Sequence, residues 1–456
     1  ERLGGDRFHA ARAETAQVAI DYTNSLFEVA RLAGIALAAP VDLGYRHDRA
    51  IVMAGHQPLI YHPGLMAKTA ALARFAADSD AFGINVVIDT DLGDGGSITW
   101  PKISGSNLEI KSATLVGGKT GSEILYSAQR LADRGVIEEI FKELVSDLLT
   151  SGLDSSANKA AKAGQLYAAL AGQPVAAAHT IVRWASNGGT QRFLEAPLSA
   201  VLAAPALSAV LKDLVIDRQR LVSIYNQTLE EYRASHRISN PANPFPNMKV
   251  GESSLELPLW IVSSSARRPC VCPKDGLELA SDERLVTRGS ITTFILRSYC
   301  SDLFIHGTGG AKYDLFVDSF AERYLDYKLP RYVVASATRH IKPERVAELE
   351  RAITLAASIK EMTSKTESFL GQGIFSAAEE SELASISLTR QELRDALSKA
   401  QSPTERSAVA QRLNAANKIV RELIESGSLR QIIASAPANQ AALTRWSYRE
   451  FPFFLW

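Results

Sequence analysis

The sequence predicts an α/β protein with a Rossmann-like parallel sheet, a helical insertion and a C-terminal helical hairpin. The main observation is a pattern of strand, polar loop, helix and strand that occurs twice, over residues 50–89 and 302–338. The strands in both copies are almost entirely apolar, as expected of strands that are covered on both faces. Two such units with right-handed crossovers build a doubly wound sheet, whose ligand crevice lies at the carboxyl ends of the strands.

The individual elements follow from apolar spacing and from the positions of glycine and proline. Amphipathic or alanine-rich stretches predict helices over 9–36, 65–77, 137–149, 157–171, 211–232 and 285–298. Short apolar or β-branched runs predict strands over 50–54, 84–89, 97–100, 112–116, 259–263, 302–305 and 332–337. After residue 343, two long charged stretches, 344–370 and 377–426, predict an antiparallel helical hairpin or a short coiled coil.

These elements suggest a division of the chain into five segments. They are the first half of a Rossmann-like core (1–120), a helical insertion (121–240), the second half of the core (241–342), a helical hairpin or coiled coil (343–430), and an aromatic tail (431–456). We expect the tail to pack back on the body, because so many exposed aromatic rings would be unfavourable in water.

Composition limits the class of protein and its partners. Lys and Arg together number 50, as do Asp and Glu, so no long-range field attracts nucleic acid or an anionic membrane. No apolar run reaches about 18 residues, so we expect no spanning helix. Three cysteines are too few for a disulfide framework or a complete zinc site, so we expect a reducing cytoplasm and no metal. The expected partner is a small-molecule substrate.

The loop after the first predicted strand carries the strongest ligand signal, because it holds two histidines in a glycine- and proline-rich frame before a helix. Backbone N–H groups and the positive end of the helix dipole favour an anion at such a place. A neutral imidazole can accept a proton from an amine or a hydroxyl group. Alternatively, both histidines only fix the shape of the loop. The candidates are catalytic His56 and the binding residues Gly55, Gln57, His62, Gly64 and Lys68.

Two further loops add candidates. The acidic loop after the second strand offers Asp89 as a catalytic residue and Asp91 as a ligand for an ammonium or hydroxyl group, unless it is an ordinary solvated turn. The glycine-rich loop after residues 302–305 precedes a helix and lets the backbone approach an anion. Its candidates are catalytic His306 and Lys312 and the binding residues Gly307, Gly309, Gly310, Tyr313 and Asp314.

Two arginines lie just upstream of this second glycine-rich loop. Arg288 and Arg297 could clamp a carboxylate or a phosphate, although solvation at the surface explains either of them equally well. A serine hydrolase is disfavoured, because the sequence has no G-x-S-x-G motif. A single ligand site made from these loops requires that segments far apart in the sequence converge, so that His56 and His306 face one shared hollow.

Several stretches occur in an order that resembles the bacillithiol-biosynthesis cysteine-adding enzymes. They are GHQPLIYHPGLMAK at 55–68, VVIDTD at 86–91, ITTFILRSYCSDLFIHGTGGAKYD at 291–314, and the trailing helical hairpin. His56 stands where that family has its first glutamine, and Lys312 stands where it has a glutamate.

The resemblance implies a Rossmann-like core of the HUP class and a homodimer formed through the C-terminal coiled coil. It also implies a ligase-like reaction that forms a C–N (amide) bond between an amino acid such as cysteine and an amine- or sugar-linked acceptor. A bound nucleotide, ATP or ADP, is compatible with that reaction. His56 would then act as a base or an anion ligand, Lys68 and Lys312 would neutralise phosphate or carboxylate, and Asp89 or Asp91 would hold an ammonium or hydroxyl group.

Two other hypotheses stay open at this point. The first is a nucleotide-binding or nucleotidyl-transfer enzyme of the HUP class, in which residues 61–64 are a divergent histidine–glycine signature. The second is a non-catalytic scaffold whose helical hairpin and aromatic tail form the working surface. Release of pyrophosphate from ATP would favour the first, and capture of a partner by residues 343–456 would favour the second.

Overall fold

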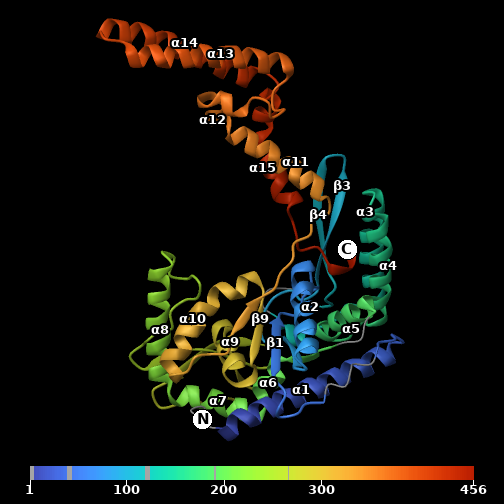
Figure 1. Cartoon of the computed structure of the whole chain (residues 1–456). Helices are drawn as coiled ribbons and strands as arrows, with labels where there is room; N and C mark the ends of the chain where they lie inside the picture. Colours follow the sequence, from blue (N-terminus) through green and yellow to red (C-terminus); the bar gives the residue numbers. More distant parts are fainter. Residues whose placement is uncertain (1–4, 39–43, 119–123, 189–191, 265) are drawn as a thin grey trace. The chain divides into compact units, whose positions relative to one another are not determined.

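The computed structural model describes residues 5–38, 44–118, 124–188, 192–264 and 266–456. Its centre is a five-stranded sheet in which every neighbouring pair of strands is parallel, as the sequence predicts for an α/β protein of Rossmann-like type (Figure 1). In spatial order the strands are β10 (Tyr332–Val334), β9 (Leu303–His306), β1 (Ile51–His56), β2 (Phe82–Val87) and β5 (Leu194–Pro197).

The two faces of β1 are covered by different helices, because successive side chains of a strand point to opposite sides. Val52 and Ala54 pack with Leu72 of α2 (Pro63–Asp78). Ile51 and Met53 belong instead to the large core cluster that includes α1 (Gly5–Leu32) and α10 (Thr308–Leu325). The continuous apolar sequence of this strand is therefore explained by burial on both faces.

The order of the strands reverses between β1 and β9. From β1 the chain proceeds outward to β2 and then β5, whereas β9 and β10 lie on the other side of β1. The helices that follow β1 and β9, α2 and α10, cover opposite faces of the sheet. A crevice opens at the carboxyl ends of the strands at such a switch point.

The predicted helical insertion needs a correction, because it contains a strand of the central sheet. β5 pairs with β2 in register from Ile84 with Leu194. The rest of the segment is helical: α3 (Arg134–Thr150), α4 (Asp154–Ala169), α5 (Val175–Asn187), α6 (Leu198–Ala203), α7 (Pro205–Ile216) and α8 (Arg218–Ser235). The boundary predicted at residues 120 and 121 lies outside the described residues.

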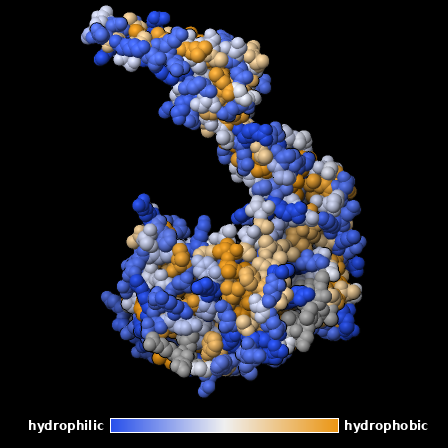
Figure 2. Space-filling view, in the orientation of Figure 1, coloured by the Kyte–Doolittle hydropathy of each residue, from blue (hydrophilic) through white to orange (hydrophobic). Residues whose placement is uncertain are grey.

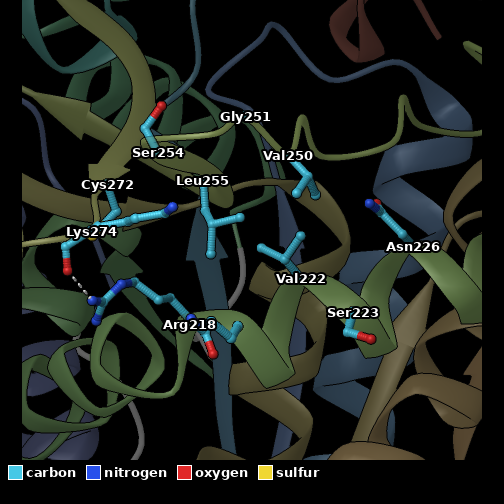
Figure 3. Close-up of a pocket in the computed structure, with 11 residues that line it drawn as sticks. Arg218, Val222, Ser223, Asn226, Val250, Gly251, Ser254, Leu255, Cys272 and Lys274 are labelled. Atoms are coloured by element: carbon cyan, nitrogen blue, oxygen red, sulfur yellow. Dashed lines mark hydrogen bonds between the residues drawn. The ribbon is translucent and has the colours of Figure 1, made fainter.

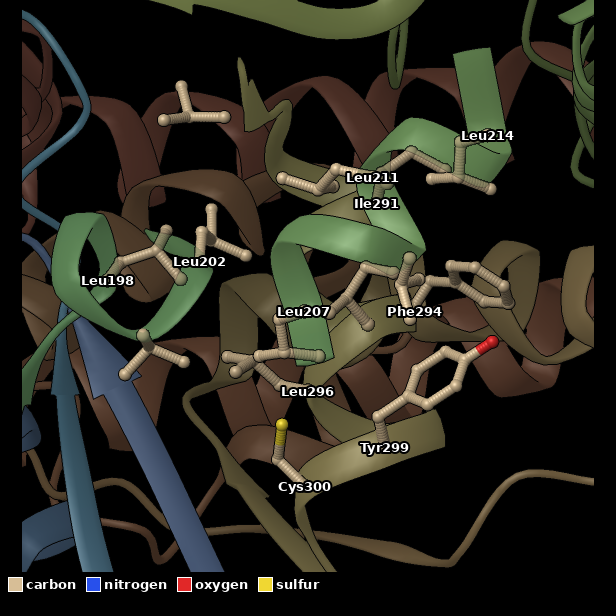
Figure 4. Packing of buried hydrophobic residues seen from close by; sticks show 14 of the residues in the cluster. Leu198, Leu202, Leu207, Leu211, Leu214, Ile291, Phe294, Leu296, Tyr299 and Cys300 are labelled. Carbon is tan, nitrogen blue, oxygen red and sulfur yellow. The ribbon is translucent and has the colours of Figure 1, made fainter. Parts of the chain in front are cut away.

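The helix predicted over residues 285–298 is also wrong in part. It begins as a strand, β8 (Arg284–Thr287), continues as α9 (Gly289–Ile295), and ends as a π-helix over Leu296–Cys300. The leucines of α6 and α7 pack against α9 and this π-helix (Figure 4). Apolar periodicity alone did not separate the short strand from the helix.

Two small β structures accompany the central sheet. β8 pairs with β6 (Ser254–Val262), which also pairs with β7 (Arg267–Pro273), and both pairings are antiparallel. β3 (Ser97–Ser104) and β4 (Asn107–Thr114) form a separate two-stranded sheet.

A second compact unit comprises residues 339–448 together with 104–109. Its helices are α11 (Pro343–Ala357), α12 (Ile359–Ser364), α13 (Ala377–Lys399), α14 (Pro403–Ser426) and α15 (Arg430–Trp446). Leu383 of α13 packs with Val420 and Ile424 of α14, and Ser402 caps the start of α14 by accepting a hydrogen bond from the backbone N–H of Glu405. In the view of Figure 2, hydrophilic residues cover most of this unit.

The predicted aromatic tail has a different boundary in the structure. Residues 430–446 form α15, which packs against α11 in the second unit. Only residues 449–456 belong to the first unit, which otherwise comprises 1–103 and 110–338. Within the described ranges, we find no helix with the length and hydropathy needed to span a bilayer.

Candidate functional site

Two adjoining cavities lie at the carboxyl edge of the sheet, beside the ends of β1 and β9. The larger has a volume of about 520 Å³ and the smaller one of about 180 Å³. The residues that line both are Gly55, His56, Gln57, Gly289, Thr293 and His306. The two histidines therefore face one shared hollow.

The sheet register explains why these two histidines meet. Ala54 of β1 is paired with Ile305 of β9, so both strands reach the same edge and end there in a histidine. The loops that follow then lead to α2 and α10 on opposite faces of the sheet. Residues far apart in the sequence are adjacent because parallel strands present their carboxyl ends together.

His306 is held by a buried carboxylate. Its Nε2 lies 2.7 Å from Oδ2 of Asp314, and the same oxygen accepts a hydrogen bond from Nη1 of Arg297 at 2.8 Å. Asp314 and Arg297 are both almost fully buried. A carboxylate that accepts the Nε2 proton leaves the lone pair on Nδ1, as in other sites where a third group orients the base.

Gly310 keeps Nδ1 of His306 accessible. A Cβ atom at position 310 would lie 2.8 Å from that nitrogen, whereas one at Gly309 would meet no atom within 4 Å. α10 begins here with Gly307 as N-cap, and no side chain caps its first turn. The first backbone N–H groups of α10 are thus close to the cavity, where they favour an anion.

His56 is a neutral imidazole at physiological pH. Burial, together with the positive charge of Lys68, lowers its pKa to about 3. Its Nδ1 lies 3.2 Å from the backbone oxygen of Gln57, so the neutral ring carries its proton there and leaves Nε2 as an acceptor. The edge of the ring meets Tyr61, with the ring centroids 5.9 Å apart.

Lys68 is a buried cation whose charge has no partner among the ion pairs of the described residues. Its side chain is 2% exposed, lines the larger cavity, and donates a hydrogen bond of 2.6 Å to the backbone oxygen of Gly55. Burial lowers its pKa to about 8, so it is still mostly protonated at pH 7. A buried ammonium group without a carboxylate favours an anionic ligand in the space beside it.

The start of α2 is arranged differently from that of α10. Nδ1 of His62 accepts a hydrogen bond of 3.1 Å from the backbone N–H of Gly64 and caps the helix. Burial is the main cause that lowers the pKa of His62. This local role supports the alternative that His62 fixes the loop, although the residue also lines the larger cavity.

Of the other predicted residues, most line one of the two cavities. Gly64, Gly307, Gly309, Gly310, Tyr313 and Asp314 line the larger cavity, and Asp91 lines the smaller one. Asp91 is paired with Arg267 at 2.7 Å and accepts a hydrogen bond of 3.2 Å from Gln57. Asp91 is thus available to a hydroxyl or amine ligand only as part of this network.

Four predicted residues line neither cavity. Lys312 is exposed on α10. Asp89 accepts hydrogen bonds from the backbone N–H and the hydroxyl of Ser199, at 2.9 and 2.5 Å, in the first turn of α6. Arg288 is paired with Glu256 at 2.8 Å, and Arg297 is paired with Asp314 and Asp318, each at 2.8 Å. These four side chains thus lie outside both cavities, and Asp89, Arg288 and Arg297 are engaged in contacts within the fold.

Sequence reasoning missed part of the wall of the larger cavity. Ser336 follows β10, while Arg449 and Glu450 lie where the chain returns to the first unit. Phe245, Ser290 and Val317 complete this part of the wall. The aromatic residues of the tail indicated that it packs back, but nothing in the sequence indicated that it reaches this edge of the sheet.

Another cavity, of about 590 Å³, lies between the start of α8 and the β6–β7 pair (Figure 3). It shares no lining residue with the two cavities at the sheet edge, and Val222, Val250 and Leu255 give it an apolar wall. The buried thiol of Cys272 also lines it, and burial raises the pKa of that thiol. This cavity has no histidine or carboxylate in its lining.

In the described part of the chain, no group of three or more His, Cys, Asp or Glu side chains is arranged to hold a metal ion. Comparison of the sequence with models of known families and with curated proteins gave no match. The function must therefore be argued from the site itself.

Proposed function

We propose that this protein is a ligase-like enzyme that joins two small molecules through a C–N (amide) bond. The proposed substrates are an amino acid such as cysteine and an amine- or sugar-linked acceptor. The observation that carries the proposal is the pair of cavities of unequal size that share His56 and His306 in their common wall. Two substrates bound in adjoining spaces meet at their junction, which lowers the entropic part of the barrier.

His306 is the proposed general base. Asp314 holds its Nε2, so Nδ1 is free to take the proton that an amine loses as it attacks an acyl carbon. His56, which lines the same two cavities, is neutral and offers Nε2 as a second acceptor. Lys68 neutralises a carboxylate or phosphate in the larger cavity. Asp91, with Gln57 and nearby threonines, would hold polar groups in the smaller cavity.

Amide formation from a free carboxylate needs activation, and a nucleoside triphosphate such as ATP is the proposed co-reactant. A carboxylate oxygen displaces ADP from the terminal phosphorus and forms an acyl phosphate. The amine nitrogen then bonds to the acyl carbon, phosphate leaves with the electron pair of the broken C–O bond, and Nδ1 of His306 takes the amine proton. Lys68 and the first N–H groups of α10 would hold the phosphate groups.

The test is product analysis with the whole chain. The protein is incubated with ATP, a mixture of the twenty amino acids and a panel of amino sugars, and products are sought by mass spectrometry. We expect an adduct equal to both substrates minus water, formed together with ADP and phosphate. The His306→Gln variant should form no adduct. If no adduct appears with any pair while the parent protein still binds ATP, the ligase hypothesis fails.

The uncapped start of α10 favours a second candidate, a HUP-class enzyme of nucleotide binding or nucleotidyl transfer. Glycine at positions 307, 309 and 310 leaves room for a phosphate at this helix end. In that case ATP would release pyrophosphate rather than phosphate, and a nucleotide would be transferred to the second substrate. Measuring both anions in the same incubation separates the two reactions.

We also propose a homodimer formed through α13 and α14, in the cytoplasm. Leu388 of α13 is 65% exposed and Ile419 of α14 is 45% exposed, and the proposed dimer would cover these two apolar side chains. Light scattering of the whole chain should give twice the mass of one chain, and Leu388→Lys should reduce it to one. If the parent protein has the molar mass of one chain, the proposed dimer is refuted.

A further inference from the structure

The larger cavity has a second positive side chain that comes from an unexpected part of the chain. Arg449 lines it, next to Glu450, where the chain enters the first unit after the long segment 339–448. Arg449 is exposed and has no ion-pair partner among the described residues. Lys68 lies in the same lining but is buried. The cavity thus has one positive charge in its wall and another at its solvent side, beside the carboxylate of Glu450.

The segment that carries Arg449 is firmly docked on the first unit. The backbone N–H of Phe453 donates a hydrogen bond of 2.7 Å to the backbone oxygen of Tyr61. The hydroxyl of Ser156 donates one of 2.6 Å to the backbone oxygen of Leu455. Phe451 and Phe454 are buried, and Phe454 packs against Phe141 of α3 with the ring centroids 6.0 Å apart. These contacts fix the position of Arg449, four residues before Phe453.

The docking contact also reaches the loop that follows β1. Tyr61, whose oxygen accepts the bond from Phe453, meets the edge of His56 with its ring. The guanidinium of Arg183 lies over the same tyrosine ring, 4.5 Å from its centroid. Tyr61 is therefore fixed from two sides, and one of them is the returning segment. If that segment were displaced, both Arg449 and the support of the His56 loop would change.

We propose that Arg449 is an anion-binding residue of the larger cavity and that docking of residues 449–456 completes the site. The ligand group is a phosphate or a carboxylate, held between Lys68 and Arg449. This inference rests on the proposed function because it takes the larger cavity as the ligand site. It does not depend on which reaction takes place there. A charged hydrogen bond from a rim arginine contributes less than one from a buried group, so we expect a moderate effect on affinity.

The experiment measures binding of inorganic phosphate to the whole chain by isothermal titration calorimetry at fixed ionic strength. Arg449→Gln should weaken phosphate binding about fivefold to tenfold and leave the melting temperature without phosphate unchanged. The matched control is Arg445→Gln, which removes an equal charge from the exposed last turn of α15 in the second unit. It should bind phosphate as the parent does.

A second pair of variants tests the docking. Phe454→Ala and Ser156→Ala remove contacts of the segment and leave Arg449 in place, and both should weaken phosphate binding. If Phe454→Ala lowers the melting temperature by more than a few degrees, its lower affinity could come from general destabilisation. Ser156→Ala alone then decides whether docking is needed for phosphate binding. The proposal is overturned if Arg449→Gln binds as the parent does, if both arginine variants lose affinity equally, or if the parent does not bind phosphate. Parental affinity in the docking variants would refute the requirement for docking.

Failure of this proposal and failure of the ligase hypothesis give different results. Phosphate binding is measured without any turnover, so a protein that forms no amide can still show the expected difference between Arg449→Gln and Arg445→Gln. Conversely, if the protein is an active ligase but Arg449→Gln binds phosphate as the parent does, the ligase hypothesis stands. Only the role assigned to Arg449 is then refuted.

Discussion

Replacing Lys68 with methionine should stabilise the protein and at the same time abolish its anion binding. The side chain is 2% exposed, and burial lowers its pKa from 10.5 to about 8. Since one pKa unit corresponds to about 1.4 kcal/mol, keeping this lysine charged in the folded state costs about 3 kcal/mol at pH 7. Methionine has a similar length and no charge, so the substitution removes that cost.

The substitution also removes the hydrogen bond that Lys68 donates to the backbone oxygen of Gly55, and this loss offsets part of the gain in stability. Because the donor is charged, a bond of this kind contributes about 1.5–3 kcal/mol, so the net stabilisation at pH 7 should be about 1 kcal/mol, or about one to two degrees in melting temperature. The sign depends on pH. Because the pKa is lower in the folded state, the destabilisation by the charged lysine is fully present below pH 8 and disappears as the pH rises towards 10.5. The advantage of methionine should therefore be present at pH 7 and lost at pH 10.

The assay is differential scanning calorimetry of both proteins at the two pH values, with and without phosphate. Phosphate should raise the melting temperature of the parent at pH 7 and leave that of Lys68→Met unchanged. Lys312→Met is the matched control, since Lys312 is exposed and should affect neither quantity. A Lys68→Met variant that melts below the parent, or that keeps the full phosphate effect, would show that Lys68 is a structural residue and would refute the anion site.

Four further results are expected. His306→Gln should reduce turnover by at least a hundredfold in the adduct assay, with phosphate affinity retained. Gly310→Ala should impair turnover because its Cβ would lie 2.8 Å from Nδ1 of His306. The control Gly309→Ala should be active, because its Cβ would meet no atom within 4 Å. Equal activities of the two variants would contradict the role of Nδ1. Phosphate affinity measured by calorimetry should fall as the pH rises above 8, where Lys68 loses its charge in the free protein, and a flat profile would exclude Lys68 as the ligand. Asp89→Ala should lower the free energy of unfolding by about 1–3 kcal/mol, read as a lower melting temperature, without changing phosphate affinity; the reverse pattern would restore Asp89 to the site.

The strands at the centre of the sheet were predictable because their sequences are almost entirely apolar. β1, β2 and β9 were placed to within two residues, because their sequences show burial on both faces. β5 has four residues, as β9 does, but it was missed because Glu195 places a charge in the middle of the strand and Pro197 ends it. Its carboxylate is fully buried against Arg183, a partner that no local pattern indicates. A long-range ion pair can thus place a charged residue in a central sheet.

The candidate site shows a similar limit. Gly310, Tyr313, Asp314 and Val317 line the larger cavity at the spacing of one helix face, and Lys312 falls on the other side of α10. The sequence prediction took the residues after the glycine loop together and did not consider the helical phase, which separates Lys312 from the residues that line the cavity. Arg449 could not be found in this way, since its position depends on where a long segment returns.

The docked return of the chain at residue 449 also bears on how such a protein can be rearranged. Ser336 and Arg449 line the same cavity, so the chain leaves and re-enters the first unit at neighbouring points. A segment whose two ends lie close together can be exchanged as a cassette, with little demand on linker length. Related architectures could therefore acquire different helical arms at this position and keep the histidine junction intact.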